Sequence, residues 1–222
     1  MTTLIPEGTL THPHGVAVNA NGDVFVCDTS NKTVRAFITS PPAALTASPA
    51  APTFPVTTED AGLCGTPAFA DGDKAAARFT TLQSVTADTV STDMVIMDSG
   101  SHLVRRMTPG AVTSTFAGNV GVAAVTNLNG LAAEFSSPAD SAIDASGNLF
   151  IVETGGHTAR KVDTGATAST LVGTALTPGH NDATGTSAIF NTPSGIATFN
   201  SDAELLIADS ANNCVRHVVI SS

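Results

Sequence analysis

An acidic residue followed seven positions later by an arginine occurs four times along the chain. Each acid ends an apolar run, and each arginine lies in a second β-prone run. Turn-forming Gly, Ser and Asn residues separate the two runs, and this pattern is typical of a β-hairpin. The four pairs are Asp28–Arg35, Asp98–Arg105, Glu153–Arg160 and Asp209–Arg216. A hairpin that recurs in this way predicts a repeat architecture.

The segments between the hairpins recur as well. In three linkers a glycine precedes a phenylalanine by 17 residues, and a segment typical of a further strand comes before each glycine: Thr57-Thr58, Ser114–Ala117 and Ser169–Val172. We interpret that segment as an outer strand and the residues after the phenylalanine as an inner strand, so that each unit has four strands. A four-stranded unit of about 55 residues is typical of a propeller blade. The spaced residues are Gly62 and Phe79, Gly118 and Phe135, and Gly173 and Phe190.

Two of the apolar runs show no alternation of polar and apolar residues. They span residues 94–97 and 149–152. A strand that is buried on both faces has this composition, and a blade packed between two other blades buries both of its faces.

The sequence therefore predicts an all-β fold, a β-propeller of four four-stranded blades. We expect residues 1–222 to form one domain with units at about 10–62, 63–118, 119–173 and 174–222. The fourth unit ends after its third strand, while Thr2–Ile5 is similar to the outer strands at Ser114–Ala117 and Ser169–Val172. We predict that residues 2–5 pair with the last blade and close the ring, which removes an open sheet edge.

The repeats resemble those of NHL-repeat propellers. The resemblance rests on Pro193–Ala197, Leu206–Asp209, Asn212 and the Val215-Arg216 pair, and on Gly147–Ile151 in the third unit. Domains of this family often have six blades, whereas four units are found here. The resemblance therefore leaves three arrangements open: a compact four-bladed ring, a piece of a larger propeller, or a half that pairs with another chain.

Charge and composition exclude some classes of partner. The chain carries 9 Lys and Arg against 19 Asp and Glu, a formal net charge of −10, and it has no Trp or Tyr. Nucleic-acid binding requires a basic patch and is aided by aromatic side chains that stack on bases, so we expect none. No apolar run is long enough to span a membrane, and the first residues do not form a signal peptide. The cellular compartment is not determined by the sequence.

The acid–arginine pairs are interpreted as structural. A pair that recurs once per blade ties its own hairpin together, because a ligand site on a propeller is rarely repeated in every blade. The four arginines also account for much of the positive charge. His102 and His157 stand at the same turn position of two hairpins, and we interpret them as turn residues.

His12, His14 and Asp140 are the candidate metal ligands. The two histidines flank Pro13 just before an inner strand, and residues two apart on an extended segment point to the same side. Asp140 occupies almost the same position in the third unit. Imidazole and carboxylate groups suit a divalent metal at the mouth of the channel. This set supports the alternative function, a metal-dependent lyase or hydrolase.

The function that the sequence favours is non-catalytic. We expect a binding or scaffold propeller that docks a protein or peptide on its loop face, without a cofactor and as a monomer. A dimer would instead favour the half-propeller. The most distinctive loop is a Pro/Ala-rich insertion near residues 39–53 of the first unit.

Overall fold

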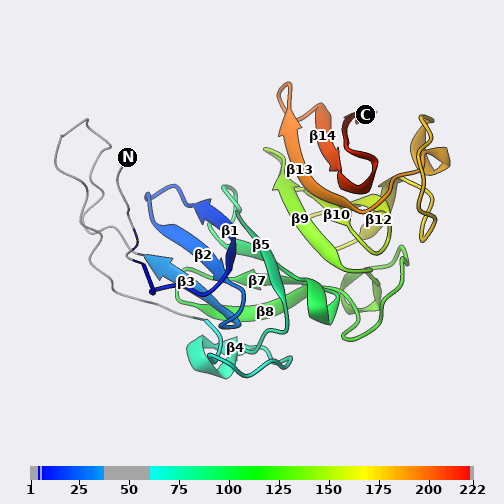
Figure 1. Ribbon diagram of the computed structural model, residues 1–222. Helices are drawn as coiled ribbons and strands as arrows, with labels where there is room; N and C mark the ends of the chain where they lie inside the picture. The colour runs from blue at the N-terminus through cyan, green and yellow to red at the C-terminus, as the bar shows by residue number, and fades with distance from the viewer. Residues whose placement is uncertain (1–4, 6, 38–60, 221–222) are drawn as a thin grey trace.

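The fold consists of four antiparallel β-sheets that follow one another along the chain (Figure 1). It is seen in a computed structural model that describes residues 5, 7–37 and 61–220. Each sheet contains one of the four acid–arginine hairpins. The prediction of an all-β, propeller-like fold is confirmed.

The sheets share one plan, in which an inner strand is followed by the two strands of the hairpin. The first sheet contains β1 (Pro13–Val18), β2 (Val24–Asp28) and β3 (Thr33–Phe37). The second has the order β4-β8-β7-β6-β5 and contains β4 (Gly72–Asp73), β5 (Leu82–Ala87), β6 (Met94–Asp98), β7 (Leu103–Met107) and β8 (Val112–Ala117). The third contains β9 (Pro138–Ile143), β10 (Leu149–Glu153), β11 (Thr158–Val162) and β12 (Ala168–Val172). The fourth contains β13 (Pro193–Phe199), β14 (Glu204–Asp209) and β15 (Cys214–Val219).

Five short 3-10 helices lie in the linkers and hairpin turns of the described residues. They are η1 (Lys74–Ala76), η2 (Ser99–Ser101), η3 (Gly130–Ala132), η4 (Gly185–Ser187) and η5 (Ser210–Asn212). In the described part of the chain, no helix is long and apolar enough to cross a membrane.

The core lies between neighbouring sheets and forms three clusters. The inner strands pack in the series β1, β5, β9 and β13. Each cluster combines the hairpin of one unit with strands of the next; Phe25 and Cys27, for example, pack with Phe79 and Ile96. Every residue of β6 and β10 is buried, which confirms the prediction that these strands are covered on both faces.

The series of sheets is open at its ends within the described residues. Among the described elements, β1 and β13 do not share an interface of the kind that joins the other inner strands. Figure 1 shows the first and fourth sheets at opposite ends of the arc. The predicted ring closure by residues 2–5 lies, apart from Ile5, outside the described residues, as do the insertion near 39–53 and the start of the predicted outer strand of the first unit. Closure of the ring stays a prediction.

Candidate functional site

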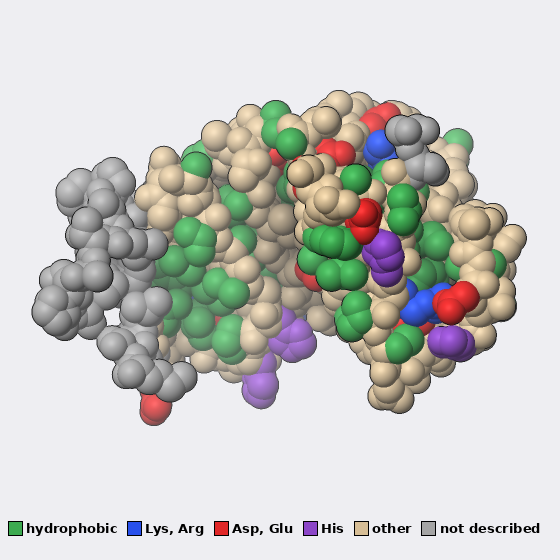
Figure 2. Space-filling model, turned by 90° about the horizontal axis from the view of Figure 1, so that it is seen from above, with side chains coloured by type: hydrophobic (Ala, Val, Ile, Leu, Met, Phe, Trp, Pro, Cys, Tyr) green, Lys and Arg blue, Asp and Glu red, His purple; other side chains and the backbone are tan. Residues whose placement is uncertain are grey.

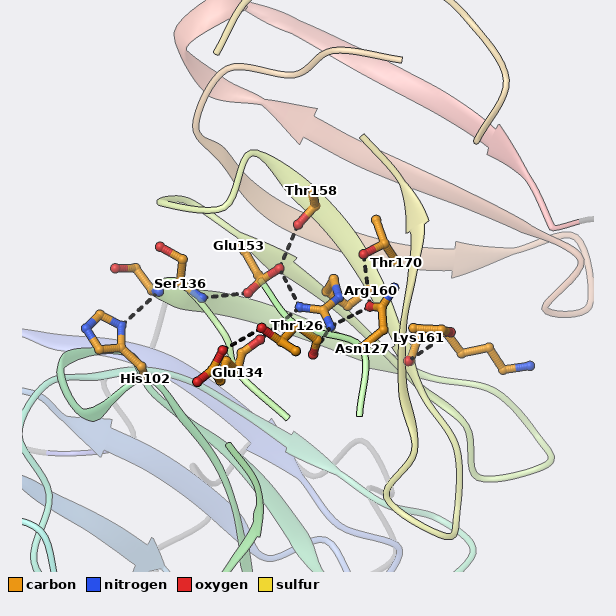
Figure 3. A network of polar contacts seen from close by, with 12 residues as sticks. His102, Thr126, Asn127, Glu134, Ser136, Glu153, Thr158, Arg160, Lys161 and Thr170 are labelled. Atoms are coloured by element: carbon orange, nitrogen blue, oxygen red, sulfur yellow. Dashed lines mark hydrogen bonds and ion pairs between the residues drawn. The ribbon is translucent and has the colours of Figure 1, made fainter. Parts of the chain in front are cut away.

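The acid–arginine pair of the third unit is fully buried (Figure 3). Arg160 donates to Glu153 Oε2 at 3.2 Å, to the carbonyl oxygens of Glu134 and Thr126, and to Asn127 Oδ1 at 2.9 Å. Its guanidinium carbon also lies 5.1 Å from the centre of the Phe135 ring. One arginine therefore ties the hairpin to the linker that leads into the same unit.

Glu153 completes this network from the other side. It accepts hydrogen bonds from the Ser136 backbone N–H and the Thr158 hydroxyl, both at 2.6 Å. Burial raises the pKa of Glu153 above its usual range, although Arg160 and these hydrogen bonds oppose the shift. A carboxylate whose partners all belong to its own unit has a structural role.

Two other units repeat the contact. Arg105 lies 3.6 Å from Asp98 and donates to Asp71, and Arg216 lies 3.1 Å from Asp209 and donates to Asp182. In the first unit Asp28 accepts from the Thr11 N–H at 2.7 Å, and Arg35 donates to the Thr9 carbonyl at the same distance. In each unit the acid and the arginine contact residues of that same unit. The pairs therefore have a structural role and do not form a shared ligand site.

His102 and His157 join neighbouring units. Both have left-handed backbone conformations, with φ of 61° and 56°, as expected for the turn position. Their Nδ1 atoms accept backbone N–H groups of the next unit, from Ser137 at 3.1 Å and from Thr192 at 3.0 Å. The turn residues are therefore also acceptors between blades, which sequence patterns do not show because each donor lies 35 residues away.

His157 gives the fold a testable dependence on pH. Burial lowers the pKa of His157 below 6.5, and Asp209 opposes the shift. The folded state thus favours the neutral ring, so its contribution is complete above about pH 6.5 and is lost as the pH falls below that value. We expect His157→Asn to flatten the pH dependence of urea unfolding between about pH 7 and 5. Asn213 adopts the same left-handed turn in the fourth unit, so the replacement fits the backbone. An unchanged pH dependence would contradict this role.

The candidate metal ligands do not come together. His12 has a φ of 51° and precedes β1, so it does not share an extended segment with His14, and its Nδ1 contacts the Ser30 hydroxyl at 3.1 Å. Asp140 instead turns to β13, where Oδ2 accepts the Ile196 N–H at 3.1 Å. Burial raises the pKa of Asp140, and this bond and the Ser141 N–H oppose the shift. In the described part of the chain, no group of three or more His, Cys, Asp or Glu residues is placed to hold a metal ion. The lyase or hydrolase alternative therefore has no ligand set among these residues.

A groove along the outer edge of β15 is a candidate binding site. It is a cavity of about 460 Å³ between β15 and the linker that enters the fourth unit. Apolar side chains, including Phe190 and Val172, line it together with Arg216, His180 and Asp182. Within the described residues, β15 is the last strand of its sheet, so its outer edge has no neighbouring strand.

The third unit shows which kind of segment would occupy this groove. There β12 pairs with the outer edge of β11, and the Thr170 hydroxyl donates to Asn127 Oδ1 at 3.1 Å. In the second unit Thr115 of β8 donates to Asp71 at 3.0 Å in the same way. Asp182 takes the corresponding place beside Arg216, and its side chain is 82% exposed. The groove therefore has the polar and apolar features of an outer-strand position. The sequence signal for it was the missing fourth strand of the last unit.

Comparison with known proteins identifies the repeat. A family model for the NHL repeat matches residues 10–37, which contain Asp28 and Arg35. This chain contains an NHL repeat. The three later units share its acid–arginine spacing. No curated protein matches the chain.

Several solved structures share the fold. A protein of unknown function from Bacteroides thetaiotaomicron is 21% identical, with a TM-score of 0.74 over 94% of this chain and 47% of its own. An auxiliary nutrient binding protein from Bacteroides ovatus is 15% identical, with a TM-score of 0.71 over 100% of this chain and 50% of its own. Virginiamycin B lyase from Staphylococcus aureus is 12% identical, with a TM-score of 0.57 over 98% of this chain and 58% of its own. The chain spans about half the length of these proteins, and identities this low show the fold alone.

Proposed function

We propose that this NHL-repeat chain is a non-catalytic binding or scaffold module that docks an extended peptide segment of a partner protein. The observation that carries the proposal is the groove beside the open edge of β15. An extended peptide that adds to a sheet edge gains backbone hydrogen bonds, while side-chain pockets select its sequence. The sequence favours docking on the loop face, and the β15 groove is a described surface that offers an extended peptide an open strand edge. The binding role of the Bacteroides ovatus neighbour is consistent with this function.

The chemistry of the groove defines the peptide. A threonine hydroxyl would donate to Asp182, as Thr170 does to Asn127 and Thr115 to Asp71. The residues that follow it would be apolar, as Leu171 and Val172 are in β12. We therefore expect a short, uncharged, β-prone segment with a central threonine.

The probe for this function is a labelled peptide with the sequence of residues 166–173, which contain β12. We expect it to bind the purified protein, and we expect Asp182→Ala to weaken binding about tenfold, because a hydrogen bond to a charged group contributes about 1.5–3 kcal/mol. Asp73→Ala is the matched control, since it removes an exposed acid from the linker of the second unit. Fluorescence anisotropy measures both affinities.

Either of two results would contradict the proposal: no binding of the peptide, or equal affinities for the Asp182 and Asp73 variants. A peptide in which valine replaces the threonine tests the same bond from the other side. It should lose about as much affinity as the Asp182 variant loses.

A four-bladed ring closed within one molecule is the alternative arrangement of the chain, in which its own first and fourth units meet each other. In that arrangement residues 2–5 occupy the β15 groove, and Thr3 aligns with Thr170 and Thr115. The chain would then block its own site. Deletion of residues 2–5 should enhance peptide binding if the ring closes in this way, and it should leave binding unchanged if it does not.

A further inference from the structure

Each unit of the chain has a forward face that packs against the next unit. The face is marked by the residues one and three positions before the acid and by the residue directly before the arginine. In the first three units all nine of these residues are at most 4% exposed. They are Phe25, Cys27 and Val34, then Val95, Met97 and Val104, then Phe150, Val152 and Ala159.

The forward face of the fourth unit is uncovered in the described structure. Val215 is 67% exposed and Leu206 is 38% exposed, although they align with Ala159 and Phe150. Phe199 and Val219 extend the same apolar surface at 41% and 65% exposure. His217 and Glu204 lie among these residues on the same face, and His217 contacts Glu204 and the Phe199 ring.

On the back face of the first unit, the inner strand β1 is exposed in the described structure, whereas Val26 and Phe37 on the hairpin strands of that face are buried. In the second and fourth units, the inner-strand residue that pairs with the middle of the first hairpin strand packs on the preceding unit. These residues are Val85, which is 5% exposed, and Ile196, which is 8% exposed. Val16 holds this position in β1 and is 64% exposed, and Val18 beside it is 56% exposed. Figure 2 shows hydrophobic side chains gathered on both the amino-terminal and the carboxy-terminal units.

We propose that the forward face of the fourth unit packs on the back face of the first unit of a second copy of this chain. The three interfaces inside the chain supply the argument, because every covered forward face there meets a back face. The forward face of the fourth unit and the exposed inner strand of the first unit are therefore complementary in kind. Exposed apolar patches of this type mark interaction sites. The contact joins different surfaces of the two copies, so two such contacts close a ring and repeated contacts without closure extend a chain of copies.

Charge sets the conditions for this association. Each copy has a formal net charge of −10, so two copies repel each other at low ionic strength. Since the contact itself is apolar, added salt should strengthen it by screening the repulsion.

Sedimentation velocity and light scattering across a concentration series test the proposal. We expect the wild-type mass to rise from that of one chain to that of two or more, at lower protein concentration when salt is added. Val215→Glu should hold the protein at one chain, and so should Val16→Glu. Leu131→Glu is the matched control, because Leu131 is 64% exposed but lies in η3, on neither face. Circular dichroism establishes that each variant folds, and the replaced side chains are all exposed.

A mixture of the two blocked variants gives the sharpest result. The Val215 variant keeps its back face and the Val16 variant keeps its forward face, so together they should form a heterodimer through one intact contact. The proposal is overturned if the wild type stays a single chain at every concentration and salt. It is also overturned if Val16→Glu still dimerises while Val215→Glu does not, because that result means that two forward faces meet. Peptide binding at the β15 groove is measured separately through Asp182, so failure of one proposal does not imply failure of the other.

Discussion

Replacing Arg160 with methionine is expected to lower the free energy of unfolding by about 3–5 kcal/mol, because it leaves Glu153 buried without its counter-charge. Neither side chain is exposed to solvent. The carbonyl oxygens of Glu134 and Thr126 also lose their donor. Such a loss is several times the value of about 0–1 kcal/mol expected for an exposed pair. Urea unfolding followed by circular dichroism measures the change.

Lys161→Met is the matched control for this experiment. Lys161 is adjacent to Arg160 on β11 but is partly exposed, so its replacement should change stability by less than about 0.5 kcal/mol. The double variant Arg160→Met with Glu153→Leu should regain part of the lost stability, because it removes both buried charges together. A loss of under about 1 kcal/mol for Arg160→Met would mean that the pair is not part of the frame of the blade.

The sequence predicted the repeated part of the fold because that part is local. Each hairpin places an apolar run, a turn and the arginine within about 14 residues, and the register of β10 and β11 pairs Glu153 with Thr158 across that turn. The short strand β4 was not predicted. Its pairing with β8 joins Gly72 to Thr113, and two residues carry no periodicity that a sequence pattern can reveal.

The exposure of the apolar faces on the first and fourth units could not be predicted, for a different reason. Val16 and Val215 have the same apolar character as their buried equivalents, so composition does not distinguish a covered face from an open one. The metal prediction assumed that His12 continues the strand of His14. A positive φ at His12 removes the alternation on which that prediction depended.

Phe135→Ala is the second change with a large expected effect, a loss of about 3–5 kcal/mol in the free energy of unfolding. Phe135 is fully buried at the interface of the second and third units, where it packs with Val95 and Met97 of the preceding hairpin. It also lies beneath the guanidinium of Arg160. The replacement therefore leaves a cavity between two blades and removes the ring that Arg160 covers.

The size of this loss, relative to that of Phe69→Ala, tests whether blades are held by their interfaces or by their own hairpins. Phe69 also lies close to an arginine, with the guanidinium carbon of Arg105 5.0 Å from its ring centre, but it is 40% exposed. If burial between blades dominates, Phe135→Ala costs several times more than Phe69→Ala. If the arginine–ring contact dominates, the two losses are equal. In the described structure an interface of this kind covers only one side of the fourth unit. A dominant interface term therefore also means that covering its open forward face would stabilise the chain.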